Sequence, residues 1–136
     1  MNFLAIIVAA IVNVALGGLW YSPVLFAKKW AKAMGMKSDD FAKTQKTMGP
    51  GMYIPPLLAG LVTSFVLAWF INALHVTTLG GGIQIGFLAW LGFTTTAQVL
   101  NSWIFSDGKP KEVYFINTGY HLVAFCVMGA ILAVWR

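Results

Sequence analysis

Four apolar stretches, each about as long as a bilayer is thick, constrain this 136-residue chain more than any other feature of its sequence. A hydrocarbon core of roughly 30 Å requires about 20 apolar residues per helix, so each stretch can cross a membrane once. Only 10% of the residues are charged, whereas soluble domains carry about 25%. The sequence therefore predicts an all-α integral membrane protein, with four transmembrane helices forming a bundle in a single domain over residues 1–136.

The predicted helices span about residues 3–27, 52–74, 83–105 and 113–135. Pro23 lies near the end of the first, where it kinks the last turn or ends the helix early. Gly80 to Gly82 can supply a tight reversal before the third helix, and residues 106–110 suggest a turn before the fourth. For the basic connection 28–51 we expect a short amphipathic helical segment in the membrane interface, with a solvated loop as the alternative.

The lysines indicate how the chain is threaded. All eight lie in the first-to-second and third-to-fourth connections, and Arg136 is the basic residue on the other side. The positive-inside rule therefore predicts a multi-pass protein with both basic connections in the cytoplasm and both termini outside. Lysines beside a membrane segment also contact anionic lipid. The expected lipid contacts are Lys28, Lys29, Lys32, Lys37, Lys43 and Lys46. Because they are not spread over a folded basic surface, no nucleic-acid partner is expected.

Neutral polar residues inside the predicted helices are the candidates for a site. No Asp, Glu, Lys or Arg lies deep in any apolar stretch, which argues against an ion-coupled transporter. In the third stretch the residues at helical spacing are Trp90, Thr94, Gln98 and Asn101. We therefore expect these four side chains to share one face of the helix. At about 1.5 Å per residue, polar residues of three helices fall at similar depths. The candidate ligand- or pore-lining residues are Asn13, Thr94, Gln98, Asn101, Asn117, Tyr120 and His121.

A purely structural interpretation of the polar residues stays open, because amides that cross between helices hold them together. Gly17, Gly60 and Ser64 lie on narrow faces of small residues and are the expected helix-packing positions. Small faces left over after four helices have packed would suit neighbouring copies, so we expect a homo-oligomer.

Motifs for catalysis and metal binding are missing. The sequence has no HExxH, no Cys/His ligand spacing and no glycine-rich phosphate loop. Its two histidines are far apart and predicted at different depths, and Ser64 and Ser102 have no acid–base pair near them in sequence. We therefore expect neither an enzyme nor a bound metal or cofactor.

The most specific motif follows the first apolar stretch. It consists of Trp20, Tyr21, Ser22 and Pro23, then Phe26, Lys28, Lys29 and Trp30. We interpret Trp20, Tyr21, Ser22, Pro23 and Trp30 as the anchor that sets the membrane boundary. The motif resembles the first-helix signature of small membrane proteins grouped as domain of unknown function 1761, although Ala27 stands where that family has glycine.

The Gln98–Asn101 stretch and Asn117, Tyr120 and His121 of the last helix are also similar to that family. The resemblance covers nearly the whole chain. It implies a bacterial four-helix protein, and with it the inner membrane, but it brings no established activity.

Two functions are consistent with these features. The first is an oligomeric permeation or small-ligand-binding protein with a neutral polar lining, which predicts a cavity open toward the cytoplasmic side. The second is a structural or accessory membrane protein whose polar residues only fix helix packing, which predicts that those side chains bond to one another.

Overall fold

All regular structure in the described part of the chain is helical, as the sequence predicts. The computed structural model describes residues 1–105 and 109–136, without the side chains of Ser38, Phe41 and Gln45. The elements are α1 (Phe3–Trp20), α2 (Ala27–Ala33), α3 (Ser38–Met48), η1 (Gly49–Tyr53), α4 (Ile54–Ala73), α5 (Leu79–Ala89), η2 (Trp90–Asn101), α6 (Ser102–Phe105) and α7 (Lys111–Val134). The element η1 is a 3₁₀-helix and η2 is a π-helix. Residues 106–108 of the turn expected before the last helix lie outside the described residues.

Within the described residues, four helical stretches are long and apolar enough to cross a membrane. They are Phe3–Trp20, Ala42–Ala73, Leu79–Phe105 and Lys111–Val134. The second and fourth predicted helices agree with α4 and α7 to within two residues. The other two differ in ways that have a physical cause.

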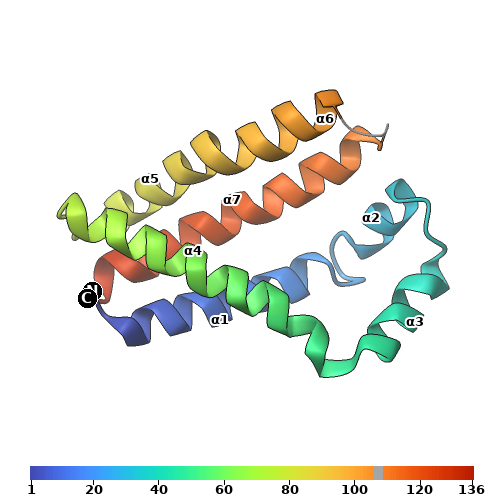
Figure 1. The fold of residues 1–136 in the computed structure, drawn as a ribbon, viewed down its shortest axis with the longest axis horizontal. Coiled ribbons are helices and arrows are strands. Elements are labelled where there is room, and N and C mark those ends of the chain that lie inside the picture. Colours follow the sequence, from blue (N-terminus) through green and yellow to red (C-terminus); the bar gives the residue numbers. More distant parts are fainter. Residues whose placement is uncertain (106–108) are drawn as a thin grey trace.

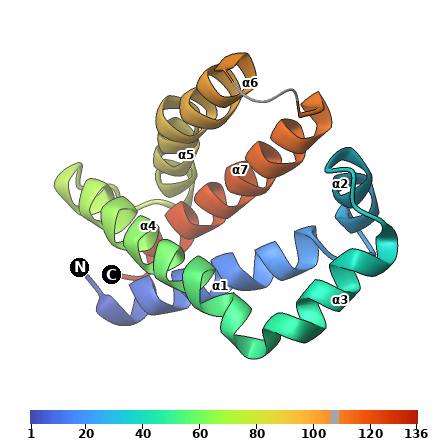
Figure 2. The ribbon, with the colours of Figure 1, turned by 45° about the vertical axis from the view of Figure 1, so that its right-hand side comes forward.

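Helix α7 is central to the arrangement. The continuous run of α5, η2 and α6 follows one side of α7, α1 lies along another side, and α4 crosses over α1 and α7 (Figure 1; Figure 2). Where α1, α4, α5 and α7 meet, small and aliphatic side chains are buried, among them Ala9, Leu67, Ile71, Ala124 and Met128. This core lies in the half of the molecule that holds the termini, so the other half is packed less completely.

The first helix ends seven residues earlier than predicted, at Trp20 instead of residue 27. Pro23 has no N–H to donate, and its ring disfavours the helical conformation at the residue before it. Ser22 takes over the carbonyl of Leu19, to which it donates through its backbone N–H (3.2 Å) and its hydroxyl (2.6 Å). Proline thus ends the helix, the second of the two outcomes left open for Pro23.

The glycines before the third span do not form the reversal. Gly80 to Gly82 lie inside α5, which begins at Leu79, four residues before the predicted start. The reversal lies between α4 and α5, where His75 has a φ of 53°. Thr78 caps α5 by accepting the N–H of Gly81 at 3.1 Å. A threonine cap can start a helix even ahead of three glycines.

The third span changes its helical geometry along its length. From Trp90 to Asn101 it is a π-helix, a form that usually occurs as single turns and often near functional sites. Hydroxyl groups in and beside this segment compete for backbone carbonyls. Thr96 donates to Gly92 O at 2.6 Å, and Ser102 donates to Ala97 O at 3.0 Å. Such bonds bend and loosen helices, which gives a local reason for the wide turns.

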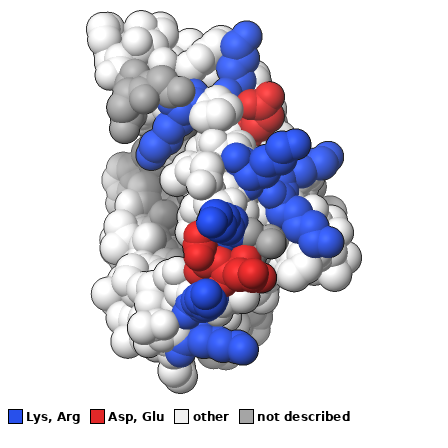
Figure 3. All heavy atoms as spheres, turned by 90° about the vertical axis from the view of Figure 1, so that its right-hand side faces the viewer, with Lys and Arg blue, Asp and Glu red and all other residues white. Residues whose placement is uncertain are grey.

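The basic connection folds into two short helices, α2 and α3, at the end of the molecule opposite the termini (Figure 1). Gly35, with a φ of 73°, separates them, and Gly49, with a φ of 60°, follows α3. Figure 3 looks at this end and shows the basic side chains gathered there. The fold therefore has one lysine-rich end and one end that carries both termini.

Candidate functional site

Two polar pairs join α1 and the segment after it to α7 at the lysine-rich half. The hydroxyl of Tyr120 donates to Asn13, 2.8 Å from its Oδ1 and 3.1 Å from its backbone carbonyl oxygen. Asn13 is buried. Its amide therefore fixes α7 against α1 and does not present itself to a ligand.

The Tyr120–Asn13 bond should be measurable in the stability of the protein. Tyr120→Phe leaves the buried oxygen of Asn13 without its donor, and a hydrogen bond between membrane helices contributes about 0.6–2 kcal/mol. We expect a fall of that size in the free energy of unfolding, measured by circular dichroism in detergent. Tyr53→Phe, at an exposed tyrosine, is the control. Equal stability of both variants would show that the bond holds nothing together.

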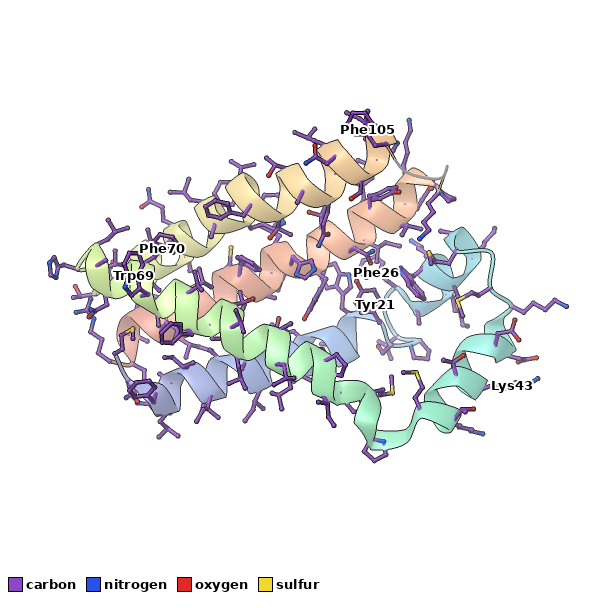
Figure 4. The ribbon with its side chains drawn as sticks, viewed as in Figure 1. Tyr21, Phe26, Lys43, Trp69, Phe70 and Phe105 are labelled. Carbon is purple, nitrogen blue, oxygen red and sulfur yellow. The ribbon has the colours of Figure 1, made fainter. Side chains whose placement is uncertain are left out.

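The second pair involves Tyr21, which follows α1 and lies between the end of that helix and α7 (Figure 4). Its hydroxyl donates to Asn117 Oδ1 at 2.6 Å, and its ring packs on those of Tyr120 and Trp30 at 5.7 and 5.9 Å. Burial, and secondarily the neighbouring Tyr120, raise the pKa of the Tyr21 phenol well above its usual range. Tyr21 therefore stays protonated and acts as a hydrogen-bond donor.

The residues predicted as the membrane anchor also pack inward. Trp20 donates its indole N–H to the carbonyl of Ile116 in α7 at 2.9 Å, and its ring lies 4.8 Å from that of Phe26. Trp30 is half-buried against Tyr21, whereas Pro23 is exposed. The motif after α1 thus closes one side of the molecule against α7.

A cavity of about 340 Å³ lies between α1, α2, η1, α4 and α7; we call it the α1–α7 cavity. It is lined by Val14, Gly17, Gly18, Tyr21, Trp30, Met52, Tyr53, Pro56, Asn117 and Tyr120. The wall is mostly apolar and aromatic, with the polar groups of Tyr21, Asn117 and Tyr120 placed on the α7 side. A few polar groups in an apolar wall are typical of small-molecule sites.

A second cavity, of about 590 Å³, lies between the end of the third span and the start of α7; we call it the α6–α7 cavity. It is lined by Gln98, Asn101, Ser102, Phe105, Lys109, Val113, Tyr114 and Asn117. Three of the candidate lining residues, Gln98, Asn101 and Asn117, therefore meet here. Asn117 lines both cavities, so the two lie on either side of this one side chain.

Thr94 and His121 are not among the described residues that line either cavity. Thr94 is half-buried in the π-helix, and Trp90 of the same predicted face donates instead to the carbonyl of Thr118 at 2.8 Å. His121 is half-buried with its ring 4.8 Å from that of Tyr120 and 6.2 Å from that of Phe125. Of the seven predicted residues, Asn13 and Tyr120 thus form a helix contact and Tyr120 also lines the α1–α7 cavity. Gln98, Asn101 and Asn117 line the α6–α7 cavity, and Thr94 and His121 lie outside both linings.

The expected packing residues lie at helix contacts. A Cβ added to Gly17 would be 3.3 Å from the Tyr120 hydroxyl, and one added to Gly60 would be 2.9 Å from Asn13 Nδ2. Ser64 is fully buried and donates to Met128 Sδ at 3.3 Å. Small residues therefore allow α1, α4 and α7 to approach one another closely.

A close contact between α5 and α7 was not predicted from the sequence. Gly82 and Gly86 of α5 face α7 so closely that an added Cβ would overlap the backbone carbonyls of Gly129 and Phe125. We call this contact of Gly82, Gly86 and Gly129 the glycine seam. The spacing Gly82-x-x-x-Gly86 is a known signal for close helix packing and could have identified it.

No three His, Cys, Asp or Glu side chains gather in the described part of the chain. The chemistry available at the cavities is hydrogen bonding by amides and hydroxyls, with the ammonium of Lys109 at the α6–α7 cavity. Such groups suit binding.

The fold and these sites define a class: an all-helical protein with four described helices long and apolar enough for membrane spans and two cavities near its lysine-rich end. The chain belongs to the DUF1761 family of proteins of unknown function, whose family model matches residues 4–133. The resemblance seen in the motif after the first helix is thereby confirmed. Comparisons with curated proteins and with solved structures find no match.

Proposed function

We propose that this protein is a multi-pass membrane protein that binds a small, uncharged, largely apolar molecule in the α1–α7 cavity. The four apolar helical stretches supply the spans. Their lysine-rich end would face the cytoplasm by the positive-inside rule, which leaves the termini outside. The homo-oligomer, the inner-membrane location and the contacts of the six lysines with anionic lipid stay predictions alongside this one.

The composition of the α1–α7 cavity is the observation that carries the proposal. Its volume of about 340 Å³ falls within the range of about 300–1,000 Å³ that is usual for ligand pockets. Tyr120 and Asn117 already hold partners in Asn13 and Tyr21, so the cavity offers few polar groups and no charged side chain among its described lining. A ligand with one hydroxyl or carbonyl on an apolar body matches that wall.

Binding is better supported than permeation through one protomer. Beyond the cavity, toward the termini, α1, α4 and α7 are packed through Ala9, Leu67 and Ala124, each almost fully buried. Close packing of this kind leaves no room for a passage. The cavity thus lies in the lysine-rich half, and buried packing adjoins it on the side of the termini.

The test fills the cavity without disturbing the fold. Gly18 lines the cavity, and a Cβ added there meets no atom within 4 Å, so Gly18→Leu has room for its first side-chain carbon and adds bulk at the cavity wall. A diazirine-bearing aliphatic alcohol is photolysed with the protein in nanodiscs, and the labelled peptides are identified by mass spectrometry. We expect labels near Tyr21 and Tyr53, reduced about tenfold or more in Gly18→Leu, since even one methylene matters that much in a fitted apolar pocket.

Gly80→Leu is the matched control, because Gly80 also has open space around it but lies at the other end of the molecule. Gly80→Leu should be labelled at the same peptides and to the same extent as the unchanged protein. Labels spread along the lipid-facing helices, or unaffected by Gly18→Leu, would contradict the proposal.

A second candidate is the structural or accessory role, and the hydrogen-bonded pairs favour it. Asn13 bonds to Tyr120 and Asn117 to Tyr21, as expected if polar residues serve to join helices. The photolabelling experiment separates the two roles, because a purely structural protein has no saturable label in the α1–α7 cavity.

A further inference from the structure

The α6–α7 cavity differs from the α1–α7 cavity in the hydrogen-bonding groups it offers. Lys109 is the charged residue in its described lining, and Asn101 and Gln98 add amides from the π-helix. Asn117 contributes its amide N–H groups, because its oxygen already accepts the hydroxyl of Tyr21 at 2.6 Å. One ammonium and several amide donors around a single space favour an anion with several acceptor oxygens.

One group in the same lining is an acceptor that lacks a hydrogen-bond donor. The side-chain oxygen of Gln98 is buried and has no hydrogen-bond partner. A buried acceptor left in this state is unfavourable, so a ligand that brings a donor to it gains affinity. The nearby hydroxyl of Ser102 is already engaged, since it donates to Ala97 O. The lining thus matches a molecule that combines an anionic group with a hydroxyl.

The position of the cavity indicates where such a molecule comes from. Asn117 lies six residues after the start of α7 at Lys111, which is about 9 Å along a helix. The cavity therefore extends from the lysine-rich end to just inside the apolar span. Phe105, 84% exposed, and Val113 form apolar walls beside the polar groups. At the boundary of a bilayer, this is the depth of phospholipid headgroups, with acyl chains beginning at the apolar walls.

We propose that the α6–α7 cavity binds a phosphate ester that carries a free hydroxyl, as in the headgroup of phosphatidylglycerol. Lys109, Asn101 and Asn117 hold the phosphate oxygens, and the oxygen of Gln98 accepts the hydroxyl. The same chemistry is present in soluble glycerol 3-phosphate, so the experiment must distinguish the two sources. This inference rests on the proposed membrane location but is independent of any ligand in the α1–α7 cavity.

The experiment uses the full chain in phosphatidylcholine nanodiscs with and without phosphatidylglycerol. Native mass spectrometry counts the phosphatidylglycerol molecules that remain on the released protein. In a second arm, glycerol 3-phosphate is titrated onto nanodiscs of phosphatidylcholine alone, with intrinsic fluorescence as the readout. Lys109→Gln removes the charge, and Asn101→Leu removes an amide while leaving every charge in place. Both residues are exposed at the cavity mouth, so neither change should affect folding.

The control is Arg136→Gln, which also removes one positive charge but lies at the other end of the molecule, at the C-terminus (Figure 1). We expect Lys109→Gln and Asn101→Leu each to weaken binding about tenfold or more, as loss of a hydrogen bond to a charged ligand does, and Arg136→Gln to leave it unchanged. This pattern with phosphatidylglycerol supports the site with a lipid source, and the same pattern with glycerol 3-phosphate alone supports it with a soluble source. Equal losses in Lys109→Gln and Arg136→Gln would overturn the proposal, since they indicate diffuse attraction, and so would the absence of binding in both arms.

Discussion

A leucine at Gly86 should prevent α5 from packing on α7. An added Cβ at this position overlaps the carbonyl of Phe125 and would lie 3.0 Å from the backbone nitrogen of Cys126. Both are backbone atoms, so no side-chain rotation can relieve the overlap and the two helices must separate. Overpacking usually costs 1–3 kcal/mol and occasionally more. Because backbone is obstructed here, we expect a loss of about 3 kcal/mol or more in the free energy of unfolding.

The measurement is thermal unfolding in detergent, followed by circular dichroism and by the yield of monodisperse protein. Gly92→Leu is the matched control, since Gly92 lies further along the same span and an added Cβ there meets nothing within 4 Å. It should remain as stable as the unchanged protein. If Gly86→Leu purified with the same yield and melting temperature as Gly92→Leu, the glycine seam would not be what joins the two helices.

Replacing Gly60 by leucine should weaken the contact between α4 and α1. A Cβ added at Gly60 would lie 2.9 Å from Asn13 Nδ2 and 3.3 Å from the carbonyl oxygen of Ala10. The leucine must displace Asn13, which accepts the hydroxyl of Tyr120. We expect a loss of about 1–3 kcal/mol from overpacking. The exposed Ala59 on the same helix provides the control Ala59→Leu, which should stay within about 0.5 kcal/mol of the unchanged protein.

The two contacts of Asn13 make a sharper test possible. If leucine at position 60 acts by displacing Asn13, it also removes the bond that Tyr120→Phe removes. The sum of the stability losses of the two single variants should then exceed the loss of the double variant, because the effects of changes at residues that share a partner are not additive. Strict additivity would contradict this explanation and indicate that the leucine distorts α4 elsewhere.

The spans and the helices of the basic connection could be predicted because their signals are local. The length of an apolar stretch identifies a span. Helix α3 runs from Ser38 to Met48, with acidic residues in its first turn and Gly49 directly after its end. The end of α1 could be predicted only as two alternatives. The carbonyl of Leu19 needed a new donor, and the hydroxyl of Ser22 decided the outcome in favour of termination.

The candidate site was predictable in part. Residues that share a helix could be grouped by spacing, so Gln98 and Asn101 were placed together and do line one cavity. The bond of Tyr120 to Asn13 joins residues 107 positions apart, and no spacing within one helix reveals it. The π-helix also alters which side chains share a face, because its turns are wider than those of an α-helix.

The glycine seam has a consequence for conformational entropy. Glycine has no side-chain rotamers, so joining α5 to α7 through Gly82, Gly86 and Gly129 immobilises few rotatable bonds. The contact of α1 with α7 instead orders the side chains of Tyr120, Asn13 and Trp20. The free-energy cost of ordered rotamers grows with temperature. On heating we therefore expect α1 to separate from α7 before α5 separates from α7. The helix pair that separates first is then the one that encloses the α1–α7 cavity.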